Sequence, residues 1–163
     1  MKTKFKDLTI WITGASSGLG EALAIAFAKK GATIILSGRN EDKLEAVKEQ
    51  CKKSKNHHIV PFDISDSEQT QAAYKSAINK AGKIDWLINN AGVSQRSLIM
   101  ETSEDVERQI MELDYFAQTR LTRLVLPAML EQGGGKIVMI SSIAGLIGTQ
   151  YRGAYSAAKA AIH

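Results

Sequence analysis

Apolar, β-rich runs alternate with helical patterns along the whole chain. The first run covers residues 8–13, and residues 19–30 after it favour a helix that ends at Gly31. In that helix Leu19, Leu23 and Phe27 recur at intervals of four residues, which predicts one buried stripe.

Four more strand-like runs follow, at residues 32–37, 58–62, 84–88 and 136–140. Helices are predicted from Asn40 to about Lys53, from Ser65 or Ser67 to Ala81, over a long region from Ser103, and from about Ala154. We interpret the long region as two consecutive helices with a break. The alternation predicts one α/β domain over residues 1–163, with a parallel sheet between helices.

Two strand-like runs indicate their positions in the sheet. Pro61 in the third run cannot donate to a ladder, which is typical of a sheet edge. The fifth run, residues 136–140, is nearly all apolar, as expected for a strand buried on both faces.

Composition narrows the function classes. The chain has 163 residues, 44% of them hydrophobic and 23% charged, and a net charge of +4 that is too small to imply a nucleic-acid partner. The single cysteine, Cys51, excludes an internal disulfide, and we interpret His57 and His58 as strand-edge residues, not metal ligands. Residues 1–7 lack an apolar signal core, and no apolar run approaches the ~20 residues that span a bilayer. We therefore expect a cytoplasmic protein.

A glycine-rich turn lies between the first strand and the first helix. It reads Thr13-Gly14-Ala15-Ser16-Ser17-Gly18-Leu19-Gly20. Glycines there permit a tight turn and a close approach of the backbone to a pyrophosphate, which the helix N-terminus attracts. The spacing differs from G-x-G-x-x-G, and the alternative is an ordinary glycine-rich loop.

The ends of the next strands carry further candidate cofactor contacts. Arg39 follows Ser37 and Gly38, at the place where an acidic residue would bind the ribose of NAD(H). A guanidinium favours the extra phosphate of NADP(H), so the sequence favours NADP(H). The alternative is that Arg39 is a plain surface charge. Asp63 could accept from an adenine amine or cap the next helix. The segment Asn89-Asn90-Ala91-Gly92 would let a flat ring approach the backbone, or form a simple turn.

Three side chains after the fifth strand suggest acid/base chemistry. Tyr155 and Lys159 are four residues apart and share one face of a helix. An ammonium favours the phenolate form of a neighbouring tyrosine, which helps it to donate or accept a proton. The hydroxyl of Ser142 could hydrogen-bond a substrate oxygen.

On these motifs the chain resembles the short-chain dehydrogenase/reductase family. The matching residues are Thr13-Gly14-x-x-x-Gly18-x-Gly20, Asn89-Asn90-Ala91-Gly92, Ser142 and Tyr155-x-x-x-Lys159. Residues 92–97 also resemble the subgroup of dehydrogenase/reductase member 7 proteins. The resemblance implies a doubly wound, Rossmann-type three-layer α/β/α fold with strand order 3-2-1-4-5.

The resemblance also implies a role for each motif. Tyr155 would be the acid/base, Lys159 would favour its phenolate and hold the nicotinamide ribose, and Ser142 would orient the substrate. The cofactor would lie against Gly14, Ser16, Ser17, Gly18, Leu19, Gly20, Ser37, Arg39, Asn40, Asp63, Ile64, Asn90, Ala91, Gly92, Tyr155 and Lys159. The implied reaction is hydride transfer between NADP(H) and a carbonyl or alcohol.

The chain departs from the family pattern in two ways. Asp114 stands where the family usually has an asparagine that holds a water near the active-site lysine. It could hold that water, pair with Lys159 and slow a proton relay, or be harmless. Members also continue beyond this point, so we expect a C-terminally incomplete fold whose complete form is a homo-oligomer. The alternative function is a truncated or non-catalytic dinucleotide-binding module.

Overall fold

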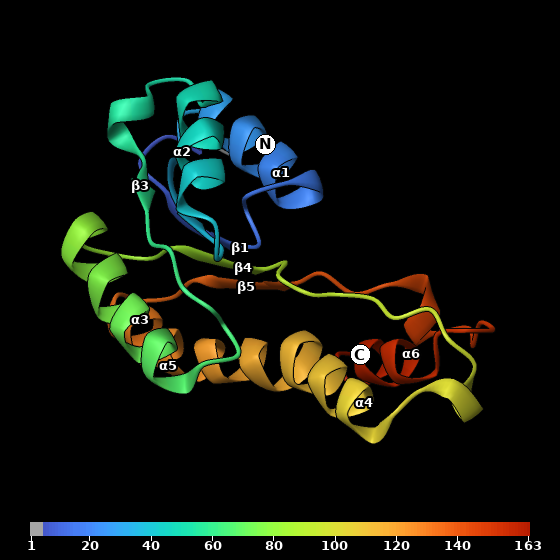
Figure 1. Cartoon of the computed structure of the whole chain (residues 1–163). Helices are drawn as coiled ribbons and strands as arrows, with labels where there is room; N and C mark the ends of the chain where they lie inside the picture. Colours follow the sequence, from blue (N-terminus) through green and yellow to red (C-terminus); the bar gives the residue numbers. More distant parts are fainter. Residues whose placement is uncertain (1–4) are drawn as a thin grey trace.

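Five parallel strands form one sheet with helices on both faces (Figure 1). The computed structural model describes residues 5–163. The strand order is β3-β2-β1-β4-β5, which confirms the predicted order and the three-layer arrangement. The strands are β1 (Thr9–Thr13), β2 (Thr33–Ser37), β3 (His58–Ile59), β4 (Trp86–Asn89) and β5 (Lys136–Met139). The sequence-based expectation about the N-terminal segment, residues 1–7, falls partly on residues 1–4, which lie outside the described residues.

Six α-helices cover the two faces of the sheet. They are α1 (Gly18–Lys29), α2 (Glu41–Gln50), α3 (Ser67–Ala81), α4 (Glu104–Met111), α5 (Ala117–Glu131) and α6 (Gly153–Ala160). In Figure 1, α1 and α2 lie on one side of the sheet, and α3, α4, α5 and α6 lie on the other. Within residues 5–163, every helix is too short or too polar to span a bilayer.

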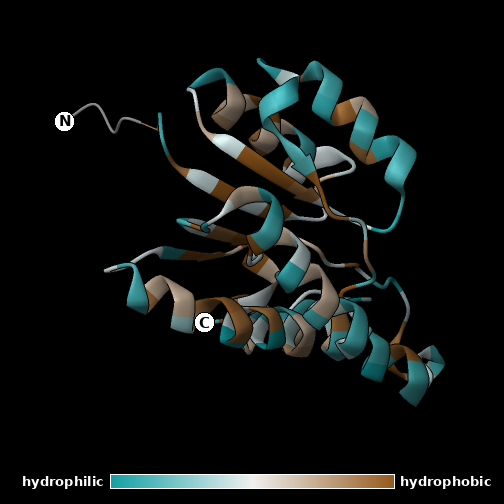
Figure 2. Ribbon diagram, turned by 90° about the vertical axis from the view of Figure 1, so that its left-hand side faces the viewer, coloured by the Kyte–Doolittle hydropathy of each residue, from teal (hydrophilic) through white to brown (hydrophobic). Residues whose placement is uncertain are grey.

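The alternation of side chains along β1 separates two buried clusters. Ile10 and Ile12 pack with α1 and α2, whereas Trp11 packs with α3 and α5. All three side chains are fully buried. In Figure 2 the strands are coloured largely as hydrophobic, and much of the helical surface is coloured as hydrophilic. A strand buried on both sides has no polar face, as expected for a parallel sheet.

The predicted buried stripe of α1 is wrong by one position. Gly20, Ala24 and Ala28 are its buried residues, while Leu19 is 53% exposed. A stripe of small residues lets the helix approach the sheet closely. A Cβ on Gly20 would lie 2.2 Å from the carbonyl oxygen of Gly14, so the face with the small residues lies nearest the sheet. Leu23 and Phe27 of the predicted stripe are partly buried at its border.

Several element boundaries differ from the prediction. Helix α2 is capped by Asn40, as predicted, but ends at Gln50 because Cys51 is already extended. Helix α3 begins at Ser67, but Asp66 caps it by accepting from the amides of Glu68 and Gln69. Strand β3 has only two residues, and α6 ends at Ala160.

The long helical region contains no break. Helices α4 and α5 are joined by a π-helical segment, η3 (Glu112–Phe116), and its flanking residues Met111 and Ala117 keep right-handed helical angles. A π turn adds one residue to the helical repeat and often occurs at a functional site. Here it contains Asp114, which is fully buried.

Strand β5 forms the second edge of the sheet. Its residues Ile137, Val138 and Met139 are only half-buried, so the expectation of burial on both faces is wrong. The reason is its position: β4 is its one partner, and α1 and α2 lie over β1 and β2.

His57 connects β2 to the segment before β3. Its Nδ1 accepts from the amide of Ile34 at 3.1 Å and its Nε2 lies 3.0 Å from the carbonyl oxygen of Lys52. The side chain is buried, so it is not the strand-edge residue that the sequence suggested. The Nδ1 contact requires a neutral ring with the proton on Nε2.

This contact predicts a loss of stability in mild acid. Burial lowers the pKa of His57 below its ordinary value of 6.5, so its contribution is complete above 6.5 and is lost as the pH falls toward the lower folded-state value. We expect the midpoint of urea unfolding to fall over this range. The variant His57→Gln should show a weaker pH dependence; equal dependence in both proteins would contradict this role.

Candidate active site

The glycine turn is fixed by contacts between β1 and β4. The side-chain Nδ2 of Asn90 donates to the carbonyl oxygens of Thr13 and Gly14 at 3.0 and 3.1 Å. The hydroxyl of Thr13 accepts from the amides of Asn90 and Ala91, both at 3.1 Å. The two motifs found in the sequence therefore form one unit, in which Asn90 acts on the turn through its side chain.

The geometry of the turn suits a phosphate group. Gly14 and Gly18 have φ values of +64° and +59°, which glycine adopts without strain. A Cβ on Gly14 would lie 2.9 Å from the Cα of Ala91, so the backbone packing requires glycine. Ser17 is the N-cap residue of α1, but its side chain accepts no hydrogen bond from the first turn of the helix. The amides of that turn are therefore open to an anion.

A cavity of about 310 Å³ opens at the carboxyl ends of β1, β2 and β4. Ten predicted cofactor residues line it: Gly14, Ser16, Ser17, Ser37, Arg39, Asp63, Ile64, Asn90, Ala91 and Gly92. Five other lining residues are not among the predicted cofactor contacts: Thr13, Gly38, Phe62, Val93 and Leu113. Of these, Thr13, Gly38 and Val93 belong to segments that the sequence singles out. Glycine-turn residues and apolar side chains such as Phe62 and Ile64 line the same cavity, which can accommodate a flat, phosphate-bearing ligand.

Six predicted cofactor residues lie outside this lining: Gly18, Leu19, Gly20, Asn40, Tyr155 and Lys159. Gly18 shapes the turn, and Gly20 contacts the backbone of Gly14. Leu19 is exposed at the start of α1. Asn40 caps α2, because its side chain accepts from the amide of Lys43 at 2.8 Å.

Some polar residues of the cavity lining already form hydrogen bonds within the protein. The Oγ of Ser37 accepts from the indole of Trp11 at 2.8 Å. The Oδ1 of Asp63 accepts from the amide and hydroxyl of Ser65. Because Asp66 caps α3, the alternative that Asp63 is the cap is wrong. Arg39 is exposed at the cavity, where its guanidinium can meet an anionic group.

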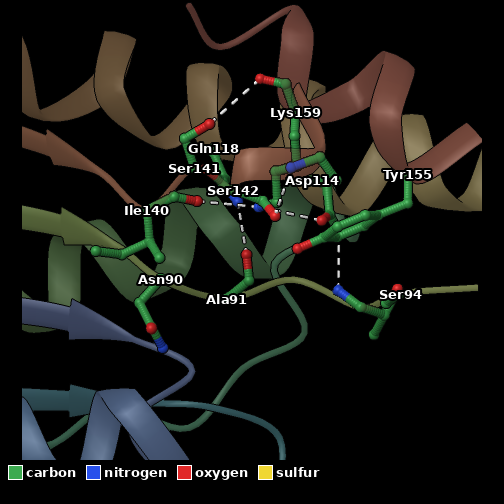
Figure 3. Close-up of polar contacts among 12 residues, drawn as sticks. Asn90, Ala91, Ser94, Asp114, Gln118, Ile140, Ser141, Ser142, Tyr155 and Lys159 are labelled. Carbon is green, nitrogen blue, oxygen red and sulfur yellow. Dashed lines mark hydrogen bonds and ion pairs between the residues drawn. The ribbon is translucent and has the colours of Figure 1, made fainter. Parts of the chain in front are cut away.

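The predicted acid/base residues lie on α6 and on the loop after β5 (Figure 3). The Nζ of Lys159 is 5.6 Å from the centroid of the Tyr155 ring. It also donates to the carbonyl oxygen of Ile140 at 3.0 Å, which ties α6 to the end of β5. Ser142 follows β5 and accepts from the amide of Ala144 at 3.2 Å, so its own hydroxyl proton is available to a substrate.

Asp114 meets Lys159 directly. Its Oδ2 is 3.2 Å from the Nζ of Lys159, and its Oδ1 accepts from the amide of Val93 at 2.8 Å. Burial raises the pKa of the Asp114 carboxyl, while the Val93 amide and the lysine charge act in the opposite direction. A Cβ on Gly92 would lie 3.0 Å from this carboxylate. Of the alternatives that the sequence left open for Asp114, the structure shows direct pairing with Lys159.

The sequence model of the short chain dehydrogenase family matches residues 8–163. The chain belongs to the short-chain dehydrogenase family. Family membership accounts for the order of the glycine turn, the Asn90 segment and the Tyr155–Lys159 pair. Enzymes of this family are oxidoreductases that bind a nicotinamide dinucleotide.

Similar proteins agree with this short-chain dehydrogenase assignment. The chain is 44% identical to human dehydrogenase/reductase SDR family member 7 and 42% identical to the mouse protein, covering 96% of this chain and 48% of each relative. The likeness to the member 7 subgroup is confirmed. The chain spans about half the length of the curated relatives it matches.

Two solved structures have the same fold. A short-chain dehydrogenase from Streptomyces avermitilis matches with a TM-score of 0.90 and 35% identity, over 95% of this chain and 56% of that one. A putative gluconate dehydrogenase from Agrobacterium tumefaciens matches with a TM-score of 0.91 and 25% identity, over 98% and 64%.

Three residues of this short-chain dehydrogenase site escaped the sequence reasoning. Gln118 is buried, and its Nε2 donates to the carbonyl oxygen of Ala91 at 2.6 Å. Gln95 accepts from the amide of Tyr155 at 3.4 Å, and Arg152 donates to the hydroxyl of Ser94. A local pattern gives no signal for such contacts, because each joins residues 27 to 60 positions apart.

Proposed function

We propose that this chain supplies the NADP(H) site and the acid/base residues of an oxidoreductase that interconverts a carbonyl and an alcohol. The observation that carries the proposal is the Tyr155–Lys159 pair, held by Ile140 and Asp114. The same Asp114 also accepts from Val93, a residue of the cavity lining. A dinucleotide site and an acid/base pair are thus linked through one buried carboxylate.

Each residue has a distinct part in the proposed reaction. The bound dinucleotide supplies the redox chemistry, because it carries the hydride. The Tyr155 hydroxyl gives its proton to the substrate oxygen during reduction and takes it back during oxidation. Ser142 donates a hydrogen bond to that oxygen, which favours the charge that develops there.

Lys159 has donors for more than one partner. An ammonium carries three N–H groups, and one of them donates to Ile140 while Asp114 forms an ion pair with the same ammonium. A further N–H group is available to a ribose hydroxyl. The Nζ of Lys159 also lies 5.6 Å from the centroid of the Tyr155 ring, beside the proposed acid/base.

Arg39 supports the choice of NADP(H). It lines the cavity beside Gly38, where a carboxylate would repel a 2′-phosphate and a guanidinium can bind it through two hydrogen bonds. The alternative of a plain surface charge predicts no effect of Arg39 on the choice between the two cofactors.

Reversing the charge at Arg39 distinguishes these two possibilities. We expect Arg39→Asp to lower the affinity for NADPH relative to NADH by about tenfold or more, because a charge-assisted contact is replaced by repulsion. Fluorescence titration of both cofactors measures the ratio. Lys43→Asp, the same charge change on the exposed side of α2, is the matched control. An unchanged ratio in Arg39→Asp would exclude this role.

The function itself is tested by oxidation of NADPH with a panel of aldehydes, ketones and quinones. Turnover of any member supports the oxidoreductase. Tight cofactor binding without turnover across the panel would favour the alternative, a non-catalytic dinucleotide-binding module.

A further inference from the structure

Helix α6 carries Tyr155 and Lys159 on only eight residues. A helix of this length is marginal by itself, so its position depends on contacts with other segments. The loop after β5 holds its C-terminal part. The Nζ of Lys159 donates to the carbonyl oxygen of Ile140 at 3.0 Å, and a Cβ on Gly145 would lie 2.7 Å from the carbonyl carbon of Lys159. Lys159 is therefore fixed from the side of β5.

The N-terminal turn of α6 needs an acceptor from elsewhere in the chain. The first-turn amides of a helix find no partner within it, and the amide of Tyr155 is one of them. The N-cap residue, Arg152, cannot accept from these amides, because an arginine side chain has only donors. Its guanidinium instead donates to the hydroxyl of Ser94.

Gln95 supplies an acceptor for this turn. Its Oε1 accepts from the amide of Tyr155 at 3.4 Å, across 60 positions of the sequence. Gln95 is buried, and its Nε2 donates to the hydroxyls of Ser97 and Thr102 at 3.4 and 3.5 Å. Those two hydroxyls are hydrogen-bonded to each other at 2.6 Å. The donors of the side-chain amide are thus directed to one place and its oxygen to α6.

The segment that carries Gln95 begins at the cofactor cavity. Val93, two residues earlier, lines the cavity, and its amide donates to the buried carboxylate of Asp114 at 2.8 Å. One short segment therefore contacts the cavity, the carboxylate beside Lys159 and the first turn of α6. A change at Gln95 would move Tyr155 relative to the cavity without removing a residue of the cavity lining.

We propose that Gln95 is a positioning residue for Tyr155, which caps the first turn of α6 and so sets the place of the tyrosine relative to the cofactor cavity. The proposal rests on the proposed function of Tyr155 as the acid/base. Gln95 acts through Tyr155 and has no part in the proton transfer itself. The motif Tyr-x-x-x-Lys fixes the spacing of the two side chains on the helix, and Gln95 fixes where that helix begins.

Amide hydrogen exchange, measured by NMR on the full chain, tests the cap without turnover. Gln95→Leu keeps the size of the side chain and removes the acceptor. We expect exchange of the Tyr155 amide to become about fivefold faster or more, the change expected when one helix cap is lost. The amide of Lys159, which is held from the side of β5, should exchange at the rate of the parent.

The conservative variant Gln95→Glu separates capping from packing. Glutamate keeps an acceptor at the same reach, and its negative charge is favourable at a helix N-terminus. Exchange of the Tyr155 amide should therefore stay close to that of the parent. Gln132→Leu is the matched control, because Gln132 also donates to backbone carbonyls, those of Ile84 and Gly134 before β4 and β5. It should leave exchange in α6 unchanged.

Steady-state kinetics test the positioning of Tyr155. With NADPH and a member of the aldehyde, ketone and quinone panel that the parent turns over, Gln95→Leu should lower kcat by about tenfold, because the acid/base is misplaced. The KM for NADPH should stay that of the parent, since the cavity lining is intact. Gln95→Glu should restore kcat, and Gln132→Leu should not change it.

The outcomes separate this proposal from the proposed function. Parent-like exchange of the Tyr155 amide in Gln95→Leu, an equal increase at Lys159, or equal rates in Gln95→Leu and Gln95→Glu would overturn the role of Gln95. If Gln95→Leu does not fold, Thr102→Val takes its place: it removes one partner of the Gln95 Nε2 and should give a smaller increase at Tyr155, and no increase would overturn the role.

The proposed function fails on a different result. A parent chain that turns over no member of the panel contradicts it, and the exchange rates then still decide whether Gln95 caps α6.

Discussion

Replacing Tyr155 with phenylalanine is expected to lower turnover by about 10²- to 10⁴-fold, the range that a general acid/base contributes. Phenylalanine keeps the ring, which packs with Val106 and Met111 of α4, and removes only the hydroxyl. The amide of this residue can still donate to Gln95. Cofactor affinity should therefore stay close to that of the parent.

The measurement combines NADPH oxidation with a cofactor titration on the same preparation. Tyr151→Phe is the matched control, because Tyr151 lies four residues earlier and Arg96, not Lys159, faces its ring. The control should keep its turnover. Full activity in Tyr155→Phe would remove the basis of the proposed mechanism.

Replacing Lys159 with methionine is expected to reduce the free energy of unfolding by about 3–5 kcal/mol, as when one partner of a buried ion pair is removed. Lys159 and Asp114 are 4% and 0% exposed, so the carboxylate would be left in the interior without its cation. The contact with Ile140 would be lost as well. Urea unfolding monitored by circular dichroism measures the loss.

A second substitution and the pH identify the cause of this loss. Lys159→Met combined with Asp114→Asn should recover part of the stability, because no unpaired charge remains. The single variant should also gain relative to the parent as the pH falls, since burial raises the pKa of Asp114 and protonation removes the unpaired charge. A loss that is the same at every pH, and in both variants, would instead indicate a packing defect.

The features that the sequence predicts are those encoded by local patterns. The alternation of strands and helices fixes the parallel sheet, and the spacing of Tyr155 and Lys159 places them on one helix face. The buried face of α1 is different. A stripe of large residues, which begins at Leu19, and a stripe of small residues, which begins at Gly20, have the same spacing along the helix. The close approach of Gly20 to Gly14 favours burial of the small residues.

Contacts between distant segments account for the parts that the sequence does not reveal. A π turn leaves no clear signature in an apolar repeat, yet it is where Asp114 meets Val93 and Lys159. Thr13, Gln118 and Arg152 act on partners from other elements. Their types are common in proteins, and only the fold brings them to the site.

The central claim is that the cavity at the carboxyl ends of β1, β2 and β4 binds a nicotinamide dinucleotide and prefers NADP(H). Titration of NADPH and NADH against the chain tests it most directly. We predict saturable binding of both, with NADPH bound more tightly. Failure of both cofactors to bind, or equal affinity for the two, would contradict the account.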